Sequence, residues 1–208
     1  MEKKLDLIVT RLENVCKRLE ALEQKMGMKS GGGIMSGTTK KGPVEGYEEM
    51  VLGPVNKLKE LSDKIGGDVQ TCFDFMQKSF LAEKEFIEKA IKIQKPKDED
   101  LQKMVNPIFE HVGKASNFKE KSRRSQYWNE ISSIADGLSV VSWFLYEKPL
   151  STLKELAGGG TFWANKIIKD EKEGDQNRFQ WAKQYNAVML GLQGYVKEYH
   201  ITGFKWKK

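Results

Sequence analysis

Apolar residues recur in alternating steps of three and four along the first 28 residues of this 208-residue chain. A helix with this heptad spacing carries an apolar stripe along one side, and water contacts the stripe until another helix covers it. The spacing therefore predicts that residues 1–28 form a coiled coil through which the chain oligomerises. The residues expected in its seam are Leu5, Ile8, Val9, Leu12, Val15, Cys16, Leu19, Leu22 and Met26.

The heptad register also indicates how many helices meet. With Leu5 at position a, the remaining a positions hold leucine or methionine, and Ile8 and Val15 fall at d. This distribution favours more than two strands, and a basic residue at every g position argues against a simple parallel dimer. An amphipathic helix docked on its own globular domain is the alternative, since three and a half heptads make a short coiled coil.

Residues 29–42 show no apolar period and are rich in glycine, serine, threonine and lysine. This composition is typical of a flexible linker. We therefore expect the linker to join the coil to a second domain over residues 43–204. Residues 205–208 are expected to begin a basic tail or a further linker.

Residues 43–204 contain six stretches with helical periodicity, and none has the two-residue alternation of a half-buried strand. The connections are short, so neighbouring helices are expected to run antiparallel. The predicted fold is all-α, with an N-terminal coiled-coil helix, a flexible linker and a six-helix antiparallel bundle. The six apolar periods cover residues 47–65, 69–91, 101–112, 127–145, 153–168 and 181–199.

Several residues are expected to begin or end these helices. Gly66 and Gly67 predict the end of the first, because glycine readily adopts the left-handed conformation that stops a helix. Asp68 is expected to cap the second helix. Thr152 and Glu155 have the spacing of a capping box for the fifth. The fourth helix, over residues 127–145, has the most regular period.

The aromatic residues are expected to fill the core of the bundle. This interpretation applies to Trp128, Trp143, Trp163 and Trp181. Trp206 lies beyond the last predicted helix, between lysines, where packing on the end of the bundle and contact with a partner are both open.

The net charge of +6 is distributed unevenly along the chain. Residues 29–41 and 205–208 each carry three lysines and no acid, whereas residues 42–204 are close to neutral. The bundle therefore lacks the basic surface that drives binding to a phosphate backbone, and no nucleic-acid partner is expected. A local basic patch at residues 119–124 is expected to be a solvated loop or a protein contact.

The chain offers few groups for catalysis or metal binding. His111 and His200 are its only histidines, and Cys16 and Cys72 form no metal-ligand pattern. Glycines 158–160 lack the residues of a phosphate-binding loop, so we expect them to allow close helix packing or a local helix break. A protein that is not an enzyme, with no cofactor or metal site, is expected.

Localisation follows from similar arguments. No apolar run is long enough to cross a bilayer, and the charged N-terminus does not resemble a signal peptide. A cytoplasmic protein without membrane insertion is expected, with both cysteines reduced.

Three motifs, in order along the chain, resemble the cyclase-associated protein family. The motifs are Arg11-Leu12-Glu13 repeated as Arg18-Leu19-Glu20, then Ile65-Gly66-Gly67-Asp68-Val69-Gln70, then Tyr195-Val196-Lys197-Glu198-Tyr199-His200 with Thr202, Gly203 and Trp206. The resemblance covers essentially the whole chain, and the last motif is the most specific. It departs from the family at Asn165-Lys166, where the family often has Asn-Arg, and it is only approximate at residues 121–125.

The resemblance implies an actin-regulating function for the N-terminal half of such a protein. In that family the coil multimerises the protein and, in fungal members, contacts adenylyl cyclase. The helical domain binds ADP-actin together with cofilin and promotes filament disassembly at pointed ends, at the actin cytoskeleton and cell cortex. The alternative is an oligomeric signalling scaffold whose coil binds adenylyl cyclase or another coiled-coil partner.

Loops at one edge of the bundle are the expected contact regions, because exposed loops carry binding residues more often than buried stripes do. The expected actin or cofilin contacts are Asp68, Arg123, Arg124, His200, Thr202, Phe204 and Trp206. Each has an ordinary structural alternative, such as a helix cap for Asp68, solvated charge for the arginines and packing for His200.

Overall fold

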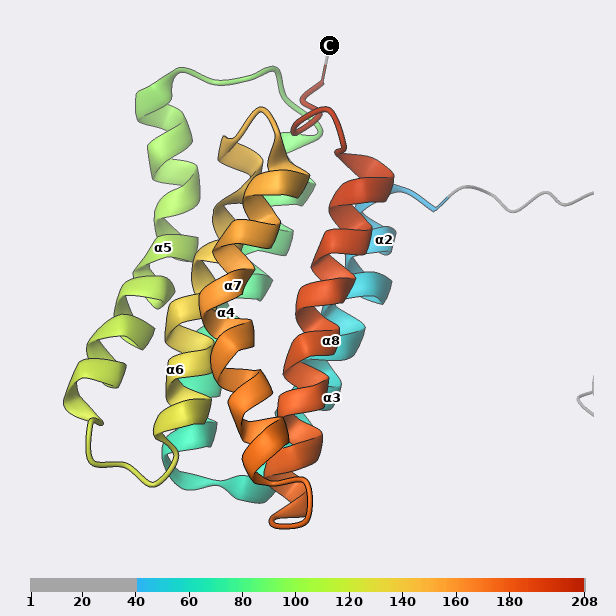
Figure 1. Cartoon of the computed structure of the whole chain (residues 1–208). Coiled ribbons are helices and arrows are strands. Elements are labelled where there is room, and N and C mark those ends of the chain that lie inside the picture. Colours follow the sequence, from blue (N-terminus) through green and yellow to red (C-terminus); the bar gives the residue numbers. More distant parts are fainter. Residues whose placement is uncertain (1–40, 208) are drawn as a thin grey trace, which may run out of the picture. The chain divides into compact units, whose positions relative to one another are not determined.

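The computed structural model describes residues 41–207. The predicted coil and most of the predicted linker, including all nine seam residues from Leu5 to Met26, lie outside the described residues. Within residues 41–207 every regular element is helical, and the long helices lie side by side (Figure 1). The predicted all-α fold is confirmed for this part of the chain.

The first helical stretch comprises α2 (Pro43–Tyr47), the π-helical turn η1 (Glu48–Leu52) and α3 (Gly53–Ile65). Pro54 has no backbone N–H, so it cannot donate the α-helical hydrogen bond to the carbonyl of Met50. Because that hydrogen bond is missing in any case, the wider π-helical turn before Pro54 does not break it. The stretch ends as predicted, because Gly66 adopts a left-handed φ of 74°.

Helices α4 (Gly67–Ala90) and α5 (Asp98–Lys121) form the next antiparallel pair. The predicted cap at Asp68 is wrong, because α4 begins at Gly67 and Asp68 lies inside its first turn. Helix α5 also continues nine residues beyond its predicted last apolar residue, Val112. Its stripe extends through buried Ala115 to Phe118, whose ring meets that of Phe75 at 6.0 Å between centroids.

The fourth predicted helix changes type halfway along. It begins as α6 (Trp128–Gly137) and tightens to a 3₁₀ helix, η2 (Leu138–Leu145). Residues of η2 are buried on almost every side, including Val140, Val141 and Trp143. Tertiary burial rather than an amphipathic face therefore governs this segment, which is why its regular spacing was misleading.

Two long helices complete the bundle, α7 (Pro149–Asp170) and α8 (Gln176–Tyr199). The predicted capping box at the start of α7 is wrong, because the Thr152 hydroxyl donates to the carbonyl of Lys148 at 3.2 Å instead. Helix α8 has a true side-chain cap, since Asp175 accepts hydrogen bonds from the backbone N–H groups of Asn177 and Arg178 at 2.8 and 3.3 Å.

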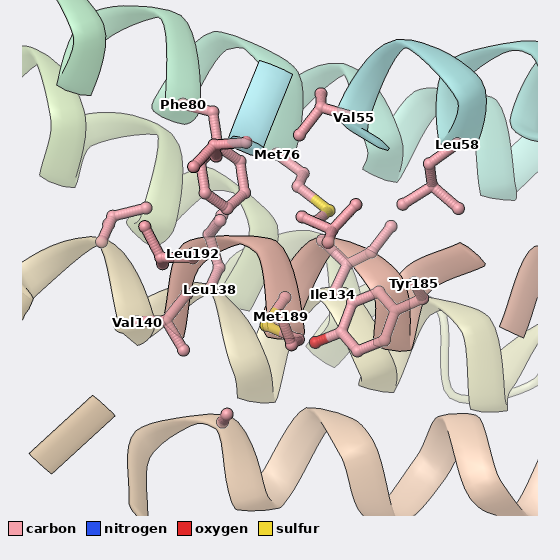
Figure 2. Packing of buried hydrophobic residues seen from close by; sticks show 14 of the residues in the cluster. Val55, Leu58, Met76, Phe80, Ile134, Leu138, Val140, Tyr185, Met189 and Leu192 are labelled. Carbon is pink, nitrogen blue, oxygen red and sulfur yellow. The ribbon is translucent and has the colours of Figure 1, made fainter. Parts of the chain in front are cut away.

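Every helix of the bundle contributes buried side chains to the core, and Figure 2 shows those of α3, α4, α6, η2 and α8 meeting there. The labelled residues are Val55, Leu58, Met76, Phe80, Ile134, Leu138, Val140, Tyr185, Met189 and Leu192. Trp143 and Trp181 are fully buried, as predicted, whereas Trp128 and Trp163 are only partly buried.

Glycines 158–160 lie inside the unbroken helix α7, so the alternative of a local break is wrong. Close packing is confirmed at Gly160. A methyl group there would lie 2.5 Å from the carbonyl oxygen of Ser133 and 2.8 Å from the Cα of Gly137, and would overlap the hydroxyl of Tyr185. The side-chain-free surfaces of Gly137 and Gly160 thus set the approach of α6 to α7.

Candidate protein interface

The seven predicted contact residues lie at opposite ends of the bundle, so the expectation of a single edge is wrong. Asp68 lies at the start of α4, beside the α5–α6 loop that carries Arg123 and Arg124. The Ser125 hydroxyl joins this loop to α4 by donating to Asp68 at 2.5 Å. The other predicted residues follow α8, near the end of α4 (Figure 1). We call these regions the loop end and the strap end.

At the loop end, a cleft of about 480 Å³ opens between α5 and α6. Its lining comprises Ser116, Lys119, Glu120, Arg123, Trp128 and Asp136. Lys119 Nζ lies 2.6 and 2.7 Å from the two carboxylate oxygens of Asp136, which also accepts from Trp163 Nε1 at 2.9 Å. Two charges of this cleft are therefore already paired within the chain.

Other charges at the loop end divide into paired and unpaired groups. Arg178 contacts both Glu130 and Glu171, and the Glu130 contact is 2.5 Å long. Arg123 and Arg124 are exposed and form no ion pair with any residue in 41–207. The side chains of the two arginines are thus accessible to a partner, and their role as contacts stays a prediction.

At the strap end, residues 200–207 fold back over the end of the bundle and form a segment that we call the strap. Gly203 takes a φ of 103°, a conformation that glycine adopts without strain. The Lys207 N–H then donates to the carbonyl of Ile93, in the α4–α5 connection, at 3.0 Å. This bond fixes the far end of the strap to a different part of the chain.

Aromatic packing holds the middle of the strap. The ring of Phe204 stacks on His200 with 4.9 Å between centroids and an interplanar angle of 7°. The rings of Phe204 and Trp206 also contact the ring of Phe86 in α4, with 5.4 and 6.0 Å between ring centroids. Of the two alternatives for Trp206, packing on the end of the bundle is therefore observed, although its side chain stays partly exposed.

His200 lies under the strap rather than on its surface. Its side chain is fully buried, with Nε2 at 3.0 Å from the Tyr195 hydroxyl and Nδ1 accepting from the Lys205 N–H at 3.4 Å. Burial, aided by the charge of Lys205, lowers the pKa of His200 to about 4. The ring is thus neutral near pH 7, and it supports the strap from beneath.

A carboxyl group that the sequence interpretation missed lies in the same cluster. Glu83 of α4 is fully buried and accepts hydrogen bonds from the Tyr47 hydroxyl, at 2.8 Å, and from Trp143 Nε1. Burial raises its pKa to about 8, against the lowering effect of both hydrogen bonds. The signal was present, because Glu83 continues the apolar stripe of Met76 and Phe80 at helical spacing.

The surroundings of Glu83 suit a protonated acid. The Tyr47 hydroxyl also lies 3.2 Å from the carbonyl of Phe80, to which it can donate. A protonated Glu83 can then donate to the Tyr47 oxygen while still accepting from Trp143, so every proton in the network has an acceptor. An ionised Glu83 would have only two donors and, among residues 41–207, no ion-pair partner to balance its charge.

A groove of about 460 Å³ lies beside the strap. Its lining comprises Lys95, Leu101, Phe144, Leu145, Tyr146, Glu147, Thr202, Gly203, Phe204 and Trp206. Several large apolar side chains at this end are well exposed, including Leu145 at 47%, Tyr146 at 41% and Ile201 at 53%. Grouped apolar exposure of this kind is typical of a protein-binding surface.

Features of metal, membrane and nucleophile sites are sparse in the described part of the chain. Among residues 41–207 there is no group of three or more histidine, cysteine or acidic residues placed to hold a metal ion. In the same residues no helix combines the length and apolarity needed to cross a membrane. Cys72 is buried, and burial raises the pKa of its thiol to about 12, so it is a poor nucleophile.

Comparison with known proteins gives a consistent family. The family model described as CAP, N-terminal domain, matches residues 47–204. Adenylyl cyclase-associated protein 1 of Homo sapiens is 30% identical over 203 residues, covering 97% of this chain and 43% of that protein. Adenylyl cyclase-associated protein 2 of Rattus norvegicus is 27% identical over 206 residues, with the same coverage. The chain thus spans less than half the length of these relatives.

Solved structures agree with the sequence matches. The N-terminal domain of the adenylyl cyclase-associated protein from Dictyostelium discoideum has a TM-score of 0.76 and 27% identity, covering 79% of this chain and 94% of that one. A crystal structure of the N-terminal domain of CAP, which indicates variable oligomerisation of that protein, has a TM-score of 0.77 and 25% identity. It covers 85% of this chain and 94% of its own.

Proposed function

Because the chain belongs to the CAP N-terminal domain family, as its motifs predicted, we propose that it is a non-enzymatic actin regulator that acts with cofilin. It promotes filament disassembly at pointed ends and the recycling of ADP-actin. The observation that carries this proposal is the family match along residues 47–204, almost the whole described bundle. The proposed location is the cytoplasm, at the actin cytoskeleton and cell cortex.

The proposed mechanism is differential binding. Contacts that favour a released or distorted terminal subunit over the packed filament lattice shift the equilibrium without covalent chemistry. The candidate contacts are Asp68, Arg123 and Arg124 at the loop end, and Thr202, Phe204 and Trp206 at the strap end. We assign buried His200 a positioning role, because it packs against Phe204 rather than reaching the surface.

Multimerisation through residues 1–28 strengthens this activity in the proposal. A coil of more than two strands places several bundles near one filament end, and this raises the effective concentration of each bundle there. Support comes from the heptad pattern and from the solved CAP N-terminal domain whose crystal structure indicates variable oligomerisation.

The direct test follows the length of single cofilin-decorated filaments with their barbed ends blocked. The full chain should accelerate subunit loss from pointed ends, and a variant lacking residues 1–28 should do so more weakly at equal bundle concentration. A pointed-end rate that stays unchanged at saturating protein would contradict the proposal.

The second candidate is an oligomeric signalling scaffold whose coil binds adenylyl cyclase or another coiled-coil partner. The names of the relatives favour it, since they are adenylyl cyclase-associated proteins. Removal of residues 1–28 separates the two functions. A scaffold would lose its partner completely, whereas an actin regulator would retain weakened activity on filaments.

A further inference from the structure

We propose that the groove at the strap end docks a partner segment that places a large apolar side chain beside carboxylate groups. The proposal rests on the proposed function for the identity of the partner, which is cofilin-decorated actin. Beyond that function, the proposal states which end of the bundle makes the main contact and which chemical groups of the partner that end binds.

Exposed apolar side chains are grouped at the strap end. Ile93, Leu145, Tyr146 and Ile201 are 39% to 53% exposed, and all belong to segments that meet at the strap. The other well-exposed large apolar residues of the described chain, Leu81, Phe162 and Leu190, are on α4, α7 and α8. The groove of about 460 Å³ is large enough to receive a bulky side chain.

In the segments around the groove, lysines outnumber acids. The lining itself holds one lysine, Lys95, and one acid, Glu147. The flanking segments add Lys92, Lys97, Lys148, Lys205 and Lys207. None of them forms an ion pair with another residue in 41–207. Opposing them are Glu147 in the lining and the acids in the first turn of α5, which face the positive end of that helix. Carboxylates on the partner would balance the excess.

The groove is already formed in the absence of a partner. The strap is fixed by the Lys207 to Ile93 hydrogen bond at one end and by the stacked rings of His200 and Phe204 in the middle. A preformed surface spends little conformational entropy on binding.

The loop end is less suited to be the main site. Its cleft has two basic and two acidic side chains, and Lys119 and Asp136 already satisfy each other. A partner carboxylate would have to compete with Asp136 for Lys119. Exposed Arg123 and Arg124 provide charge there, but no large apolar residue with an exposed side chain lines the cleft.

The test measures the pointed-end shortening rate of cofilin-decorated ADP-actin filaments over a concentration series of each full-chain variant, which gives the apparent affinity of that variant for the filament end. One variant removes apolar contact, L145S with Y146S, and another reverses charge, K205E with K207E. Each should weaken binding about tenfold or more, as central contacts do, and the charge variant should also reduce the salt dependence. All four side chains are exposed, and an unchanged melting temperature confirms that each variant folds.

Matched controls carry the same kinds of change elsewhere. K57E with K64E reverses two exposed charges on α3, and F162S with L190S removes two exposed apolar side chains from α7 and α8. Both controls should bind within about twofold of the unmodified chain, since peripheral contacts contribute little.

The outcomes distinguish the two proposals. If the unmodified chain does not accelerate shortening at any concentration, both the proposed function and this docking site are overturned. If it does but the strap-end variants have the same apparent affinity, or if a loop-end variant, R123E with R124E, is the one that loses activity, the strap groove is overturned and the proposed function stands.

Discussion

At the scale of single residues, the most unusual group is the Glu83 carboxyl. It lies among the rings of Tyr47, Trp143 and their neighbours, with two hydrogen-bond donors and no ion-pair partner in residues 41–207. Because burial disfavours the charged form, the folded protein holds this proton to about pH 8, whereas an unfolded chain loses it near pH 4.5.

The pH dependence of stability follows from this difference. Between the unfolded and folded pKa values of Glu83, each pH unit removes about 1.4 kcal/mol from the free energy of unfolding. The effect of His200 on the free energy of unfolding has the opposite sign, since its pKa is about 4 in the folded protein and near 6.5 in the unfolded chain. Its contribution is lost as pH falls through that range. The effects of Glu83 and His200 on the free energy of unfolding oppose each other between pH 4.5 and 6.5. Above pH 6.5 His200 is neutral in both states, so the Glu83 effect dominates from pH 6.5 to 8.

We therefore expect the free energy of unfolding to fall by about 2 kcal/mol between pH 6.5 and 8. In E83Q this decline should disappear, and the loss of stability below pH 6.5 that belongs to His200 should become visible. Urea denaturation at several pH values measures both. E85Q, a change at an exposed position on the same helix, should keep the unmodified profile. A flat unmodified profile from pH 6.5 to 8 would contradict the assignment.

At the scale of elements, the crossing of α6 and α7 depends on glycine. G160A should destabilise the bundle by about 1–3 kcal/mol, because the new methyl group meets backbone atoms of Ser133 and Gly137 that cannot move without separating the helices. G158A is the matched control two residues away on the same helix, where a methyl group meets nothing within 4 Å. It should stabilise by up to about 1 kcal/mol through helix propensity. Thermal or urea unfolding of both variants provides the measurement, and equal stability of G160A and the unmodified chain would rule out this account of the crossing.

The sequence predicted the number and order of the helices because each buries one apolar stripe. It failed where tertiary structure decides the local geometry. Residues 138–145 were expected to continue an α-helix, yet burial on almost every side allows the tighter η2. Asp68 and Thr152 have side chains that suit capping, but the backbone starts α4 at Gly67 and the Thr152 hydroxyl bonds back to Lys148.

The candidate site was less predictable than the fold. His200, Thr202, Phe204 and Trp206 were correctly grouped by their nearness in sequence, but the loop-end residues are separated from them by the length of α4. The groove itself depends on Leu145 and Tyr146, which join the strap only through folding. The apolar periodicity of a sequence does not indicate which distant segments come into contact on folding.

At the scale of the whole molecule, the heptad of residues 1–28 is expected to decide the oligomeric state. Sedimentation of the full chain at micromolar concentration should give a mass above that of a dimer, and a variant lacking residues 1–28 should sediment with a lower mass. L12K with L19K should reduce the mass in the same way, because both residues are at position a. K17Q, at the outward-facing position f of the same heptad register, should not. A monomeric full chain would refute the coiled-coil interpretation.

Because aromatic side chains cover Glu83, movement of the strap would change the protonation of this carboxyl group. Trp143 donates a hydrogen bond from its Nε1 to Glu83, and its ring centroid lies 5.9 Å from that of Phe204 in the strap. Any event that lifts the strap and admits water to this cluster would return the carboxyl toward its ordinary acidity and release a proton at neutral pH. The heat of such an event would then depend on the ionisation enthalpy of the buffer, so calorimetry can distinguish a partner that displaces the strap from one that binds beside it.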